Sequence, residues 1–132
     1  MLPFPIQIQA GEPIYEQIIH AVKRALATEH LRPGDRFPAV RAISAELKIN
    51  PNTVQKAVTA LVAAGVLEVR SGQGSFVARS VVADRREQAR TLEPLVEKLL
   101  IEASRLGLEE EELLTFVQKQ SRKMKETHEP NH

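Results

Sequence analysis

Four polar side chains follow an Asn-Pro pair near the middle of the chain: Asn52, Thr53, Gln55 and Lys56. The amide groups of Asn52 and Gln55 carry the paired donor and acceptor that match the edge of adenine. At the start of a helix, such side chains could read base edges in the major groove of DNA. Asn and Thr also favour helix starts that face only solvent. These four residues by themselves leave both interpretations open.

Positive charges lie close to this segment in the sequence. Arg36, Arg41 and Lys48 precede it, and Lys56 belongs to it. A guanidinium or ammonium group beside a groove can bind a phosphate and so hold a protein on DNA. The alternative is the ordinary charge of a solvated helix face. Four cations on one side of the same motif favour the DNA-binding interpretation.

A glycine-rich turn, Ser-Gly-Gln-Gly, begins directly after Arg70. Glycines would let the backbone approach a neighbouring minor groove, so Arg70, Gly72 and Gln73 are further candidates for DNA contact. A hairpin turn without a ligand is the competing interpretation. A dinucleotide-binding loop is not expected, because its fingerprint needs a third glycine and a following helix.

The spacing of apolar residues predicts the elements that must position these groups. It indicates helices over 12–30 and 39–48, separated by a stretch rich in turn-forming residues and a short extended segment. A third helix is expected to start at Pro51 with Asn50 as its cap and to end at Gly65. The period then changes from 3.6 to 2, which predicts a hairpin of strands 66–70 and 75–78. The first eleven residues, with two prolines, suggest an extended arm that docks on a surface rather than a free tail.

The C-terminal part has a different pattern. Residues 79–91 are charged and form either a linker or the exposed start of a long helix. A strong amphipathic stripe follows, with Pro94 either kinking the helix or marking its first turn. Gly107 is expected to end it, and the acids at 109–112 to start a last helix. The two helices carry more large apolar side chains than they can hide against each other: Leu92, Leu95, Val96, Leu99, Leu100, Leu106, Leu113, Phe116 and Val117.

This order of elements is that of a winged helix-turn-helix. We therefore predict a mainly α fold with a small β-hairpin. Residues 1–79 would form an N-terminal winged helix-turn-helix domain that binds DNA, and residues 80–132 a two-helix C-terminal arm. The apolar excess on that arm predicts a homodimer.

Length and composition exclude several classes of protein. The chain has 132 residues, too few for a large ligand-binding or enzymatic domain, and it contains no cysteine for disulfides or thiolate chemistry. No apolar run is long enough for a membrane span, so we expect a cytoplasmic protein with no membrane partner. Residues 1–80 hold nine Lys or Arg and six Asp or Glu, a net charge of +3. Residues 81–132 hold nine and eleven, a net −2. This asymmetry is too small to indicate DNA binding by itself.

Catalysis and metal binding are not expected. The histidines at 20, 30, 128 and 132 are scattered along the chain, and two of them lie in the polar C-terminal tail. Ser, His and Asp form no recognisable catalytic motif, and the acids at 109–112 suit a helix start. We expect no cofactor. No feature identifies a small-molecule effector, although two copies of the arm could line a pocket for one. A protein-interaction module that has lost DNA binding remains the alternative to a DNA-binding regulator.

Residues 13–77 resemble the DNA-binding domain of the GntR family of bacterial transcription regulators. The resemblance rests on PIYEQI at 13–18, LRPGDRFPAVRAISAEL at 31–47 and INPNTVQKAVTALVAAGVLEVRSGQGSFV at 49–77. The short two-helix tail resembles that of the YtrA-like subfamily, whose members lack the large effector domains of their relatives.

The resemblance implies a homodimeric regulator, most simply a repressor, that binds a palindromic operator. Arg41, Thr53 and Gly72 fall where the family contacts DNA. Asn52 and Gln55 occupy recognition-helix positions where some relatives carry Thr and Arg, and Pro51 stands where some carry a base-reading Arg.

Overall fold

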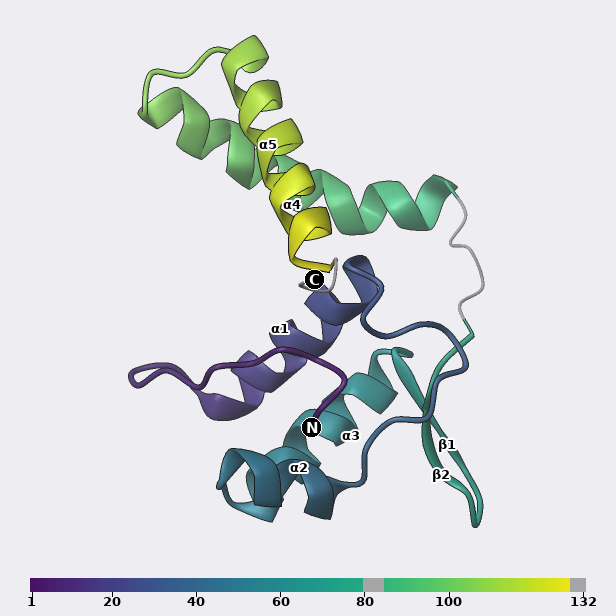
Figure 1. Cartoon of the computed structure of the whole chain (residues 1–132). Coiled ribbons are helices and arrows are strands. Elements are labelled where there is room, and N and C mark those ends of the chain that lie inside the picture. Colours follow the sequence, from purple (N-terminus) through teal and green to yellow (C-terminus); the bar gives the residue numbers. More distant parts are fainter. Residues whose placement is uncertain (80–84, 129–132) are drawn as a thin grey trace. The chain divides into compact units, whose positions relative to one another are not determined.

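The computed structural model describes residues 1–79 and 85–128, which fall into two compact units divided after residue 80. The first unit contains, in chain order, α1 (Ile14–Ala27), α2 (Val40–Leu47), α3 (Pro51–Ala63), β1 (Leu67–Arg70) and β2 (Gly74–Val77). The second unit contains α4 (Arg85–Arg105) and α5 (Glu110–His128) (Figure 1). The predicted mainly α fold with a winged helix-turn-helix is confirmed.

The core of the first unit lies where α1, α2 and the hairpin meet α3. Each of these elements turns one apolar face inward, as its periodicity predicts. The buried residues are Phe4, Ile18, Ala21, Val22, Ala25, Leu31, Phe37, Ile43, Val54, Ala57, Val58, Leu61, Leu67 and Val77.

Helix α1 is shorter at both ends than the predicted 12–30. Pro13 has the non-helical ψ of 127° and stands before the helix rather than in its first turn. At the other end, the Thr28 hydroxyl donates to the carbonyl of Arg24 at 2.9 Å, and Glu29 takes a φ of +63°. A left-handed residue cannot continue an α-helix, so the chain turns away before His30.

The connection between α2 and α3 is a tight turn held by its own polar groups. Lys48 adopts a left-handed conformation with a φ of +56°. The Ser44 hydroxyl donates to the Ile49 carbonyl at 2.6 Å, and the Ile49 N–H donates back to the Ser44 carbonyl at 3.2 Å. The Asn50 side chain accepts from the Asn52 N–H at 2.8 Å, and Pro51 is the first helical residue. The predicted cap and helix start are confirmed.

The predicted hairpin is confirmed, and a third segment joins it. Strands β1 and β2 pair antiparallel, with Glu68 opposite Phe76. Arg36 lies opposite Phe76 on the other edge of β2, and the Phe37 N–H donates to the Ser75 carbonyl at 2.9 Å. The short extended segment expected after α1 is thus an edge of this small sheet. Val69, which alternates with buried Leu67, is 65% exposed because it lies toward the tip, past the end of the core.

The N-terminal arm docks on the first unit, as predicted. Phe4 is 1% exposed, and its ring stacks on that of Phe37 with the centroids 5.7 Å apart. The backbone N–H of Leu2 donates to the Glu46 carboxylate on α2 at 3.0 Å. The amino group of Met1 lies 2.9 Å from the same carboxylate and, with the Leu2 bond, lowers the pKa of Glu46.

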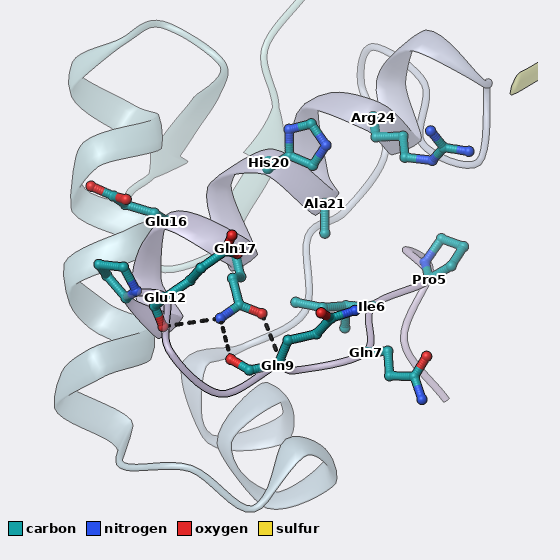
Figure 2. Close-up of a pocket in the computed structure, with 11 residues that line it drawn as sticks. Pro5, Ile6, Gln7, Gln9, Glu12, Glu16, Gln17, His20, Ala21 and Arg24 are labelled. Atoms are coloured by element: carbon teal, nitrogen blue, oxygen red, sulfur yellow. Dashed lines mark hydrogen bonds between the residues drawn. The ribbon is translucent and has the colours of Figure 1, made fainter. Parts of the chain in front are cut away.

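The Gln17 side chain of α1 makes three hydrogen bonds to the later part of the arm. The Gln17 amide oxygen accepts from the Gln9 N–H at 2.8 Å, and its nitrogen donates to the Gln9 carbonyl at 2.8 Å and to the Glu12 carbonyl at 3.1 Å. Figure 2 shows the Gln17 side chain pointing into the loop of the arm to make these bonds. The amide therefore satisfies backbone groups that a neighbouring strand would otherwise pair.

The second unit consists of two helices with little core of their own. Helix α4 begins at Arg85, so part of the charged stretch at 79–91 is helical, while 80–84 lie outside the described residues. Pro94 lies inside α4 and not in its first turn. After α4, the Leu108 N–H donates to the Ala103 carbonyl at 2.9 Å around Gly107, which ends the helix as predicted. Among residues 85–126, only Ala103 and Leu113 are buried.

Candidate nucleic-acid interface

The polar residues that open α3 lie on its solvent side. Buried Val54, Val58 and Leu61 form the opposite face. Asn52, Gln55 and Lys56 are exposed, whereas Thr53 is only half-exposed because it lies at the flank of the buried stripe. The Gln55 amide nitrogen donates to the Thr59 hydroxyl at 3.2 Å one turn later. The start of α3 thus presents amide and hydroxyl groups that the protein core leaves accessible.

Lys56 is held by a contact that the sequence did not reveal. Its ammonium nitrogen lies 4.0 Å from the centroid of the Tyr15 ring, in the first turn of α1. The negative face of an aromatic ring attracts a cation, so this contact fixes the direction of the side chain. It joins the recognition-helix position to α1 rather than leaving Lys56 as a free surface charge.

Two further cations flank the α2–α3 turn. Arg41 is the second residue of α2 and is exposed, away from buried Ile43. Lys48, the left-handed residue of the turn, is also exposed. Both side chains are accessible to a phosphate. Among the described contacts, neither forms a hydrogen bond or ion pair with Asn52, Gln55 or Lys56.

The predicted wing residues gather with Arg36 into one cluster. The Arg36 guanidinium donates to the Gln73 carbonyl at 2.7 Å. The Arg70 guanidinium stacks over the Phe76 ring at 4.0 Å from its centroid and pairs with Glu68 at 2.8 Å. Gly72, at the exposed tip, has a φ of +73°. The structure therefore places Arg36 in contact with the wing, which its position before the second predicted helix did not reveal.

Sequence reasoning missed four residues that organise this surface: Tyr15, Thr59, Glu68 and Phe76. Thr59 is one helical turn after Gln55, so its spacing could have indicated the pair. Strand alternation could likewise have put Glu68 and Arg70 on one face. Tyr15 and Phe76 act across elements, and their contacts depend on how those elements pack.

An open pocket of about 480 Å³ lies between the arm and α1 (Figure 2). Gln9, Glu16, His20 and Arg24 are among its lining residues, and none of the ten residues predicted to contact DNA is. In residues 1–79 and 85–128, no group of three or more His, Asp or Glu is placed to hold a metal ion. No helix in those ranges is long and apolar enough to cross a membrane.

Comparison with known proteins agrees with this geometry. Residues 14–77 match the family model described as bacterial regulatory proteins, gntR family. The chain is 37% identical over 109 residues to the HTH-type transcriptional regulator YhcF of Bacillus subtilis, covering 82% of this chain and 89% of the relative. It is 31% identical over 121 residues to the HTH-type transcriptional repressor YtrA of the same organism, covering 91% and 93%.

Solved structures show that the likeness extends beyond the matched segment. A transcriptional antiterminator from Listeria monocytogenes superimposes with a TM-score of 0.75 at 27% identity and covers 92% of both chains. The relatives and the family are regulators rather than enzymes, which confirms the non-enzymatic prediction. The chain therefore belongs to the GntR family of bacterial regulatory proteins, as a DNA-binding transcription regulator of the YtrA-like kind.

Proposed function

We propose that this regulator is a cytoplasmic repressor that binds a palindromic operator as a homodimer, with α3 in the major groove and the wing near the minor groove. The observation that carries the proposal is the accessible polar start of α3, which the same unit combines with exposed cations at Arg41 and Lys48 and a guanidinium group on the wing. The repressor role is supported by the relative YtrA, which is a transcriptional repressor.

In this arrangement each group has a distinct task. Asn52, Thr53 and Gln55 read base edges, because their amides and hydroxyl can donate and accept. Arg41, Lys48 and Lys56 bind phosphates beside the groove, with Lys56 directed by Tyr15. Arg70, Gly72 and Gln73 bring the wing to the minor groove. Arg36 belongs to this last group through its bond to the Gln73 carbonyl.

The dimer is supported by the apolar surface of the second unit. The large apolar side chains exposed on α4 and α5 are Leu92, Leu95, Val96, Leu99, Leu100, Ile101, Leu106, Leu114, Phe116 and Val117. Soluble monomers rarely expose such a set on two adjacent helices. A second copy could cover it by two-fold symmetry and would set two copies of α3 about one DNA turn, roughly 34 Å, apart.

Binding to duplex DNA is tested most directly by its salt dependence. Filter binding on a mixed-sequence duplex should show an affinity that falls steeply with salt, with a log–log slope of about −0.9 for each phosphate neutralised. A flat salt response, or no binding at low salt, would favour a protein-interaction module that has lost DNA binding.

Two substitutions should distinguish phosphate binding from the recognition of base edges. Arg41→Ala is expected to weaken binding to every duplex and to reduce the salt slope by about one phosphate contact. Gln55→Ala is expected to cost about 1–3 kcal/mol at one base position and to leave mixed-sequence binding little changed. Both can be measured by selecting duplexes from a random library and titrating them by fluorescence anisotropy. Unchanged low-salt affinity in Arg41→Ala would show that α2 does not face the DNA backbone.

Substitutions at the tip of the wing should impair DNA binding without disturbing the hydrophobic core. Replacing Gly72 and Gly74 together by Val should reduce DNA affinity, because their φ values are +73° and +102° and side-chain-bearing residues pay about 1–2 kcal/mol each there. A Cβ at Gly72 would meet nothing within 4 Å, and one at Gly74 would meet only the Arg36 guanidinium at 3.7 Å, an ordinary contact, so the domain should remain folded by circular dichroism. Footprinting on a selected duplex should lose protection beside the major-groove site. An unchanged footprint would make the hairpin a structural element only.

A further inference from the structure

Strand alternation places one set of charged and aromatic side chains on a single face of the wing. Arg36, Phe76 and Glu68 stand opposite one another across the segment before α2, β2 and β1. Arg70 follows Glu68 by two residues and therefore shares its face. The neighbouring positions Phe37, Val77 and Leu67 point the other way, and all three are buried. The cluster is thus fixed to the core through the backbone of its own strands.

Within the cluster, Phe76 is the common platform. The Arg70 guanidinium lies 4.0 Å from the ring centroid and the Arg36 guanidinium 5.7 Å from it. Both positive groups are attracted by the negative face of the ring. Glu68 pairs with Arg70 at 2.8 Å and offsets part of the charge that the two guanidinium groups bring together. Phe76 is only half-buried, so the platform lies at the surface.

Arg36 reaches beyond the platform to the tip of the wing. Its guanidinium donates to the Gln73 carbonyl at 2.7 Å, between residues 37 positions apart in the chain. The tip has a turn of its own, since the Gln73 N–H donates to the Arg70 carbonyl at 2.9 Å. Residues 71–74 are all exposed, so side-chain packing does little to fix the loop. The Arg36 bond therefore ties an exposed loop to the segment that leads into α2.

We propose that Arg36 is a positioning residue that holds the wing in its DNA-binding orientation, rather than chiefly a phosphate contact. The inference rests on the proposed function, in which the wing meets the minor groove. A loop that is already ordered loses less conformational entropy on binding, so fixing it in advance raises affinity. Arg is suited to this task because its planar group can stack on a ring and donate a hydrogen bond at the same time.

Hydrogen exchange of the free, full-length protein tests the positioning step without DNA. Arg36→Met removes the donors and keeps an unbranched stem, and Arg41→Met is the matched control, since it removes an equal charge from an exposed position on α2. The amides of residues 71–74 should exchange faster in Arg36→Met and at the wild-type rate in Arg41→Met. Unchanged exchange in Arg36→Met would overturn the proposal.

A double-mutant cycle tests the consequence for DNA binding. On a mixed-sequence duplex at low salt, Arg36→Met should lower affinity by about twofold to tenfold, the range expected when a preordered contact must be ordered on binding. In the Gly72→Val, Gly74→Val background the same change should have almost no further effect, because both act through the wing. A direct phosphate contact predicts the opposite: an additive loss, with a salt slope smaller by about 0.9.

The outcomes also separate this inference from the proposed function. If the wing loosens in Arg36→Met but neither that variant nor the glycine variant loses DNA affinity, the wing does not meet DNA and the positioning role fails. Arg41→Met would still lose affinity in that case, and the major-groove part of the proposed function would stand. If wild type and all variants fail to bind duplex DNA, both are overturned.

Discussion

A protein that ends at Arg79 is expected to be monomeric and to bind a palindromic duplex at least 100-fold more weakly than the full chain. The first unit has its own core and should stay folded. The shortened chain should keep Arg79, because its guanidinium packs against Gly34. A Cβ added at Gly34 would lie 2.9 Å from the Arg79 Nη2. A single half-site forfeits the effective concentration that a linked second site provides, which amounts to about 10²–10⁴ in affinity.

Light scattering and anisotropy on a selected palindrome provide the two measurements. A matched change in the full chain is Leu95→Glu with Leu99→Glu, since both side chains are exposed on α4. These charges should not disturb an isolated helix, but they would be buried without partners in a dimer. This variant should behave as the shortened protein does. A full chain that is monomeric at micromolar concentration would contradict the dimer and favour another partner for α4 and α5.

Phe4→Ala is expected to destabilise the first unit by about 3–5 kcal/mol, the usual cost of removing a buried Phe. The ring is 1% exposed and stacks on Phe37, which leads into α2. Phe37 also donates its N–H to Ser75 in β2, so the same residue joins the arm, the wing and the helix-turn-helix. Loss of the ring should therefore loosen the DNA-binding surface as well as the core.

Urea unfolding followed by circular dichroism measures this effect. Gln7→Ala is the matched control on the same arm, because Gln7 is exposed and its removal should change stability by less than about 0.5 kcal/mol. A Phe4→Ala cost below about 1 kcal/mol would mean that the arm rests on the unit without contributing to its core.

Local signals account for most of the elements that the structure contains. Apolar periodicity placed α2, α3 and the hairpin, and Asn50, Pro51 and Gly65 placed the boundaries of α3. These features were predictable because caps, left-handed stops and alternating strands depend on neighbouring residues only. The end of α1 was less predictable, since it depends on Thr28 bonding back to Arg24 and on a left-handed Glu29.

The side chains of the candidate site also include some that local patterns could place and some that they could not. Asn52, Gln55 and Arg41 could be placed on exposed helix faces from the sequence, because burial of one helical stripe exposes the opposite one. By itself the sequence thus determined which of these groups are exposed. It did not show that Arg36 also contacts the wing, since nothing local indicates that its segment pairs with β2.

Only the tertiary structure decided how those groups are held. The contacts of Lys56 with Tyr15, of Arg36 with Gln73 and of Phe4 with Phe37 join segments far apart in the chain. Such contacts follow from how helices and strands pack in three dimensions. Residue type and spacing along one element do not predict them. The sequence therefore determined the elements and the chemistry of this regulator, and packing between distant segments decided the orientation in which that chemistry is presented.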